Sequence, residues 1–178
     1  MKLNYQSKNQ GLTLIEALIW FAIFAAVVAG VFALYNNSRD SNNSATVNKE
    51  LSTIFSQTEN LYATESTNGL TNLVGLQLGV FPSSVKVTDP TKGTISNVFG
   101  GTTTIAGVAP SGFTVTYTKV PKGNTCSAIV RSQKAVGWTS ANTVVYDSTY
   151  SIAGVGTLCG TDGSGTIDLV FTRANAQT

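Results

Sequence analysis

The sequence predicts an α+β protein in which one long N-terminal helix packs on an antiparallel sheet. An apolar run occupies residues 12–35, and a helix-periodic apolar pattern follows it up to residue 65. After residue 69 the chain changes to short apolar stretches between Gly, Ser and Thr, which is typical of strands and turns. We therefore divide the chain into a leader, a membrane or assembly helix, an amphipathic continuation of that helix and a globular domain, at residues 1–11, 12–35, 36–66 and 67–178.

The composition excludes several classes of function. Charged residues make up 11% of the chain, the net charge is +2, and no Lys/Arg cluster stands out, so we expect no nucleic-acid binding. The absence of histidine removes the commonest general base and metal ligand. With no nucleophile–base pair and no phosphate-binding loop, we expect neither an enzyme nor a cofactor. A membrane-anchored exported enzyme that uses Asp147, Asp162 or Asp168 is the alternative.

Residues 12–35 predict a membrane-spanning helix. At 1.5 Å per residue this run reaches roughly 36 Å, enough to cross a bilayer. Lys2 and Lys8 precede it without an acidic residue, so the positive-inside rule keeps the N-terminus in the cytoplasm and exports the rest. An ionised Glu16 inside the run costs about 2.5–3.5 kcal/mol, which indicates a purpose. We interpret residues 1–11 as a leader cut off before Leu12; small residues inside the run offer a weaker signal-peptidase site.

Gly11, Leu12 and Glu16 together predict an assembly device. Cleavage after Gly11 gives Leu12 a free amine, which is a cation at neutral pH. Glu16 lies about 6 Å further along a helix. In the low dielectric of a fibre core, the Glu16 carboxylate of one copy can pair with the Leu12 ammonium of a neighbour, and a wrong stagger would bury both charges unpaired. The alternative is a Glu16 side chain that extends to the cytoplasmic interface.

We expect the second half of the helix to contain a polar segment followed by an amphipathic one. Asn and Ser are frequent in residues 36–44 and are poor helix formers, which predicts local loosening in an assembled fibre. From residue 47 onward an apolar stripe returns, and we expect it to pack under the sheet. Its members are Val47, Leu51, Ile54, Phe55, Leu61 and Tyr62.

The globular part contains three predicted strands and two predicted helices. Residues 113–118 alternate between apolar residues and threonine, so they form a half-buried strand. Residues 167–171 alternate too and are expected to end the sheet, and residues 143–146 are a shorter candidate. Residues 126–134 and 73–80 are candidate helices.

Cys126 and Cys159 lie after the membrane segment, without CxxC spacing. Export to an oxidising compartment favours a disulfide between them, worth roughly 3–4 kcal/mol by chain entropy; two buried free thiols are the alternative. Asp162, Ser164 and Asp168 resemble the first half of a calcium loop. Arg173 occupies the place of the acid that would complete it, so we favour a glycine-rich turn and expect no metal.

The run GLTLIE at residues 11–16, after a basic leader, resembles the class III signal of type IV pilins. The resemblance implies that a prepilin peptidase cuts after Gly11, that Leu12 is N-methylated, and that Glu16 is required for assembly. Leucine at the new N-terminus, residues 35–44 and 95–101, and the late cysteine pair resemble the type IVb major pilins of bundle-forming and conjugative-plasmid pili.

The resemblance also implies a function and a set of partners. The expected protein is the major subunit of an extracellular type IVb pilus that serves adhesion, aggregation or conjugation. Its precursor would sit in the inner membrane of a Gram-negative cell with the globular domain in the periplasm. It would require the peptidase, an assembly platform, a motor and further copies of itself. A minor pilin or a type II secretion pseudopilin is the alternative, which bound calcium would favour.

Overall fold

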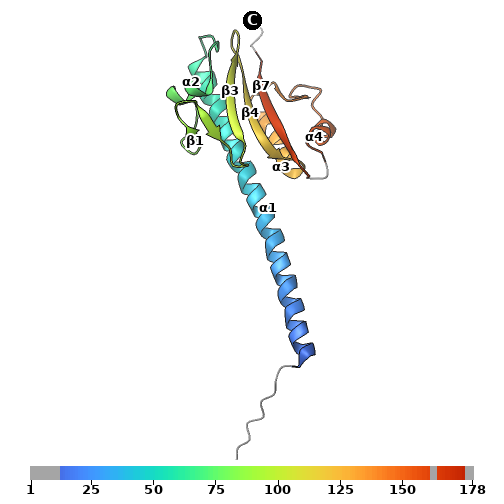
Figure 1. Cartoon of the computed structure of the whole chain (residues 1–178). Coiled ribbons are helices and arrows are strands. Elements are labelled where there is room, and N and C mark those ends of the chain that lie inside the picture. Colours follow the sequence, from blue (N-terminus) through green and yellow to red (C-terminus); the bar gives the residue numbers. More distant parts are fainter. Residues whose placement is uncertain (1–12, 161–163, 175–178) are drawn as a thin grey trace, which may run out of the picture. The chain divides into compact units, whose positions relative to one another are not determined.

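The structure is a computed structural model that describes residues 13–160 and 164–174 (Figure 1). It contains two compact units, Met1–Arg39 and Asp40–Thr178, which we describe separately. Helix α1, Leu14–Leu61, contributes residues to both units. The proposed cleavage site, Gly11 and Leu12, lies outside the described residues.

In the first unit α1 contains one apolar span, Leu14–Phe32, which is long enough to cross a membrane. None of this span is buried. The bulky side chains of Trp20 and Phe21 are 63% and 72% exposed, respectively. Apolar surface of this extent is unfavourable in water, so the span requires lipid or other protein around it.

α1 remains helical through residues 36–44 in the structure, so no loosening is present there. The Ser44 hydroxyl donates to the Asp40 carbonyl oxygen at 2.9 Å, and the Thr46 hydroxyl donates to the Asn42 carbonyl oxygen at 3.0 Å. These side chains therefore bond to the helix itself and do not offer the backbone a competing turn. Loosening inside a fibre stays a prediction.

In the second unit, residues 40–61 of α1 bury the predicted stripe. Val47, Leu51 and Ile54 are fully buried, and the same face continues to the buried Thr58. The Thr58 hydroxyl is satisfied because it donates to the Ile54 carbonyl oxygen at 2.7 Å. Leu61 is 39% exposed, and α1 ends there.

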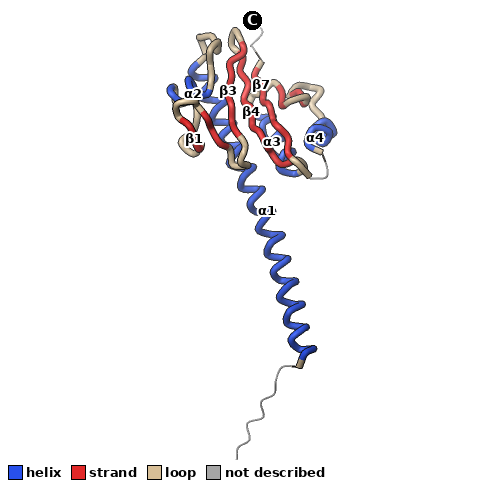
Figure 2. Tube along the Cα trace, viewed as in Figure 1, coloured by secondary structure: helices blue, strands red, loops and turns tan. Residues whose placement is uncertain are grey.

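The sheet has seven strands in the order β1-β2-β3-β4-β7-β5-β6, and every pairing is antiparallel. Figure 2 shows β3, β4 and β7 side by side in this sheet. The strands are β1 Lys86–Asp89, β2 Thr94–Ser96, β3 Thr102–Val108, β4 Gly112–Pro121, β5 Ser140–Ala141, β6 Val144–Val145 and β7 Thr166–Arg173. The helices besides α1 are α2 Asn72–Gln77, α3 Asn124–Ser132, the 3₁₀ turn η1 Gln133–Ala135, and α4 Ile152–Cys159. The fold is therefore α+β, as predicted.

β4 and β7 follow directly from their sequence patterns. Phe113, Val115 and Tyr117 of β4 are buried, whereas the threonines between them are half-buried on the opposite face. β4 contains the predicted strand 113–118, and β7 contains the predicted strand 167–171. β7 is the last strand in chain order, but it does not end the sheet in space, because it pairs with β4 on one side and β5 on the other.

A cluster of aromatic rings fills the core between α1 and the sheet. The Phe55 ring of α1 lies 4.9 Å from the Trp138 ring and 5.8 Å from the Phe113 ring, and Trp138 lies 5.7 Å from Phe171 of β7. The Trp138 indole N–H donates to Gln133 Oε1 at 3.0 Å. The core therefore joins residues from four separate stretches of chain and leaves the Trp138 donor satisfied.

Candidate assembly site

The first turn of α1 carries Glu16, the residue expected to register neighbouring subunits. Its backbone N–H donates to Thr13 Oγ1 at 3.3 Å, and the Ala17 N–H donates to the Thr13 carbonyl oxygen at 3.1 Å. The Glu16 residue is exposed. A carboxylate in the first turn is favoured by the positive end of the helix dipole. Whether Glu16 meets a Leu12 ammonium stays a prediction, because Leu12 lies outside the described part of the chain.

The second predicted pair, Cys126 and Cys159, forms a disulfide in the structure. Their Cα atoms are 5.5 Å apart, and both residues are fully buried. Cys126 belongs to α3 and Cys159 is the last residue of α4, so the bond ties these two helices together. The Gly123 N–H, just before α3, also donates to the Cys159 carbonyl oxygen at 2.9 Å.

The calcium candidate at residues 162–168 is only partly described. Asp162 lies outside the described residues, and Ser164 is exposed. Asp168 uses Oδ1 to accept the Lys119 backbone N–H at 3.0 Å, which fixes a residue with a positive φ of 59°. Among residues 13–160 and 164–174, no group of three His, Cys, Asp or Glu side chains is arranged to hold a metal.

Two of the three aspartates considered for catalysis, Asp147 and Asp168, have local structural roles. Asp147 Oδ1 accepts both the backbone N–H and the hydroxyl of Thr149, at 2.7 and 2.6 Å. These hydrogen bonds, led by the one from the hydroxyl, lower the pKa of Asp147, so it is a weaker base than an ordinary aspartate. Asp147 therefore lacks the raised pKa that a general acid–base role at neutral pH would require.

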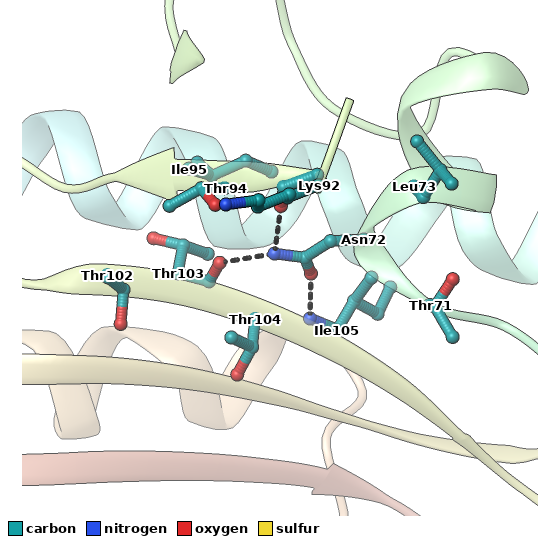
Figure 3. A pocket seen from close by; sticks show the side chains of 11 residues that line it. Thr71, Asn72, Leu73, Lys92, Thr94, Ile95, Thr102, Thr103, Thr104 and Ile105 are labelled. Atoms are coloured by element: carbon teal, nitrogen blue, oxygen red, sulfur yellow. Dashed lines mark hydrogen bonds between the residues drawn. The ribbon is translucent and has the colours of Figure 1, made fainter. Parts of the chain in front are cut away.

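A hollow of about 370 Å³ lies between α2, β2 and β3 (Figure 3). Asn72 occupies it, and its amide nitrogen donates to the carbonyl oxygens of Gly93 and Thr103, each at 2.8 Å. Its amide oxygen accepts the Ile105 N–H at 2.6 Å. Asn72 thus bridges two strands where their own pairing ends, so the hydrogen-bonding groups of its side chain are already used by the fold.

Sequence analysis missed one titratable pair, Glu50 and Tyr117. Glu50 lies on the buried face of α1 and is 5% exposed, and Glu50 Oε2 accepts the hydroxyl of the fully buried Tyr117 at 3.0 Å. Burial raises the pKa of Glu50, and the Tyr117 hydrogen bond opposes that rise. The sequence did indicate that Glu50 is buried, because it follows Val47 by three residues and therefore lies on the same face of the helix.

The exposed apolar helix and the disulfide-tied α+β domain define a pilin-like protein with a membrane-compatible N-terminal segment. The chain belongs to the family described as "PilS N terminal", which matches residues 40–174. This match and the relatives below confirm the resemblance to type IVb pilins that the sequence predicted.

Two curated relatives carry the name "Major structural subunit of bundle-forming pilus". They come from Escherichia coli O127:H6 (strain E2348/69 / EPEC) and Escherichia coli O111:H-. Each is 33% identical over 101 residues, which cover 56% of this chain and 51% of the relative. The chain therefore spans about half the length of the curated relatives it matches. No solved structure gives a significant match.

Proposed function

We propose that this chain is the major structural subunit of a type IVb pilus, an extracellular homopolymer built through the N-terminal helix. The observation that carries the proposal is the span Leu14–Phe32, which has no buried position and carries Glu16 in its first turn. A helix of this kind is stable in lipid before assembly and among identical helices after it. The family match and the names of the curated relatives support the same function.

The proposed life cycle starts with a precursor in the inner membrane and its globular domain in the periplasm. A prepilin peptidase cuts after Gly11 and methylates Leu12. The new ammonium group then pairs with the Glu16 carboxylate of a neighbouring subunit as an assembly platform and motor add subunits. A buried charge without its partner is strongly unfavourable, so the pairing selects one stagger between subunits. Adhesion, aggregation and conjugation are the roles proposed for the fibre.

The decisive experiment expresses the full chain in a cell that supplies a prepilin peptidase and a type IVb assembly machinery. Intact mass of sheared fibres should lack residues 1–11 and carry one extra methyl group. Gly11→Asp should leave the precursor uncut, because the peptidase is expected to require a residue without a side chain there. Glu16→Ala should be cut but yield no regular fibres.

Glu65→Ala is the matched control, because Glu65 is an exposed glutamate beyond the end of α1. It should assemble as the wild type does. Abundant normal fibres from Glu16→Ala, or fibres that retain the leader, would contradict the proposed pairing. Recovery of the mature chain only as a scarce component with bound calcium would instead favour the minor pilin or pseudopilin.

A further inference from the structure

Thr13 directly precedes the first residue of α1. The helix begins at Leu14, and the Thr13 hydroxyl oxygen accepts the Glu16 backbone N–H at 3.3 Å. The Thr13 carbonyl oxygen accepts the Ala17 N–H at 3.1 Å. Thr13 therefore occupies the N-cap position and Glu16 the third position of the helix, which is the spacing Thr-x-x-Glu of a capping box.

The cap acts where unsatisfied backbone groups are most costly. The first four N–H groups of a helix have no partner within that helix. The apolar span of α1 starts at Leu14, so these groups lie at the edge of the segment that enters lipid or a fibre core. Each backbone donor without a partner is far more costly there than in water, and the Thr13 hydroxyl satisfies one of them.

The proposed cleavage makes this cap more important than it is in the precursor. Removal of residues 1–11 creates an ammonium group one residue before Thr13. A positive charge next to the positive end of the helix dipole opposes the first turn. The Thr13 cap and the Glu16 carboxylate are the two features of this turn that counteract the charge, because the hydroxyl accepts a backbone N–H and the carboxylate is negative.

We propose that Thr13 is a positioning residue for assembly: its hydroxyl keeps the first turn of α1 formed after cleavage and so holds the Glu16 carboxylate in one place on the helix. This inference rests on the proposed function, since it concerns the same Leu12–Glu16 pairing. Without the cap, the first turn frays and the Glu16 carboxylate occupies a range of positions. A neighbour's ammonium group then meets a mobile acceptor, and the stagger between subunits is less well defined.

The test compares Thr13→Val, Thr13→Ser and Thr13→Asn in the full chain under the assembly conditions described above. Valine keeps the size of threonine but cannot accept a hydrogen bond, whereas serine and asparagine are good N-caps. Thr13→Val should be cut and methylated normally but yield fewer fibres by about 2- to 30-fold, the range that corresponds to loss of a threonine cap. Thr13→Ser and Thr13→Asn should restore the yield.

Thr46→Val is the matched control, because the Thr46 hydroxyl also bonds within α1 but donates to the Asn42 carbonyl oxygen and caps nothing. It should leave the yield unchanged. Normal fibres from Thr13→Val, or an equal loss from Thr13→Ser, would overturn the inference, as would a Thr13→Val precursor that stays uncut. A wild-type chain that is never cut after Gly11 would instead refute the proposed function itself.

Discussion

Tyr117→Phe tests whether a charged Glu50 is held in the core by one hydrogen bond. The Tyr117 hydroxyl donates to Glu50 Oε2 at 3.0 Å, with Tyr117 fully buried and Glu50 5% exposed. A hydrogen bond to a charged group contributes about 1.5–3 kcal/mol, against roughly 1 kcal/mol for one between neutral groups. We therefore expect Tyr117→Phe to lower the free energy of unfolding by about 2 kcal/mol at pH values where Glu50 is charged, and by about half as much where Glu50 is protonated.

The pH dependence follows from the direction of the Glu50 pKa. Because burial raises this pKa in the folded state, the folded chain binds the Glu50 proton more tightly than the unfolded chain does. The stability that Glu50 contributes is therefore complete below the ordinary glutamate range and falls as pH rises through the raised pKa. Tyr117→Phe removes the bond that opposes the rise, so the pKa of Glu50 rises further and the cost of the substitution grows with pH.

Urea unfolding of a chain that starts at Asp40, followed at several pH values, measures this cost. Tyr146→Phe is the matched control, because the Tyr146 hydroxyl donates at 2.6 Å to the neutral carbonyl oxygen of Val130, so its loss should cost the same at every pH. Asp89 and Asp147 have lowered pKa values and favour the folded state as pH rises, but they do so equally in all variants. A cost of Tyr117→Phe that does not change with pH would refute the reasoning.

Glu50→Gln keeps a hydrogen-bond acceptor and removes the charge. Its urea midpoint of unfolding should therefore exceed that of the wild type at pH values where Glu50 is charged, and should equal it in acid. Identical urea midpoints at every pH would contradict the raised pKa of Glu50. Replacing Cys126 and its partner by alanine should lower the free energy of unfolding by about 3–4 kcal/mol, measured by urea titration against the oxidised chain. Gly101→Ala should destabilise the sheet, because its Cβ would collide with the Thr118 carbonyl oxygen, and circular dichroism melting would detect this. Gly156→Ala, a helix position where the added Cβ meets nothing, should instead raise stability by up to about 1 kcal/mol.

Long, strongly patterned elements were predictable from the sequence. The spacing of Val47, Leu51 and Ile54 predicts the buried face of α1, and the alternation in residues 113–118 predicts β4, because one face of each element must be apolar. β3 was missed although Thr103 and Ile105 are buried, since its Thr-rich run contains little apolar signal. α4 was missed because Gly154 and Gly156 are poor helix formers. In the structure the Ser151 cap at 3.0 Å and the disulfide to α3 hold this helix in place.

The candidate site divides in the same way. Glu16 could be singled out as a candidate because a carboxylate in an apolar run is conspicuous in any sequence, and its role in assembly stays a prediction. The Glu50–Tyr117 pair was not, since its two members are 67 residues apart and only the tertiary fold brings them together. The Thr13 cap was predictable in part. Its spacing to Glu16 can be read from the sequence, but the bond from the Glu16 N–H to the Thr13 hydroxyl could be identified only once the structure placed the helix start at Leu14.

The position of β7 between β4 and β5 has a consequence for biogenesis. β4 cannot acquire its second neighbour, and β5 cannot join the sheet, until residues 166–173 have been synthesised and are free to pair. The sheet is therefore completed by the last of its strands in chain order, although β3 and β4 can pair before that strand is made. A chain stopped before Thr166 would leave the free edges of β4 and β5 exposed, and such edges pair readily with other chains.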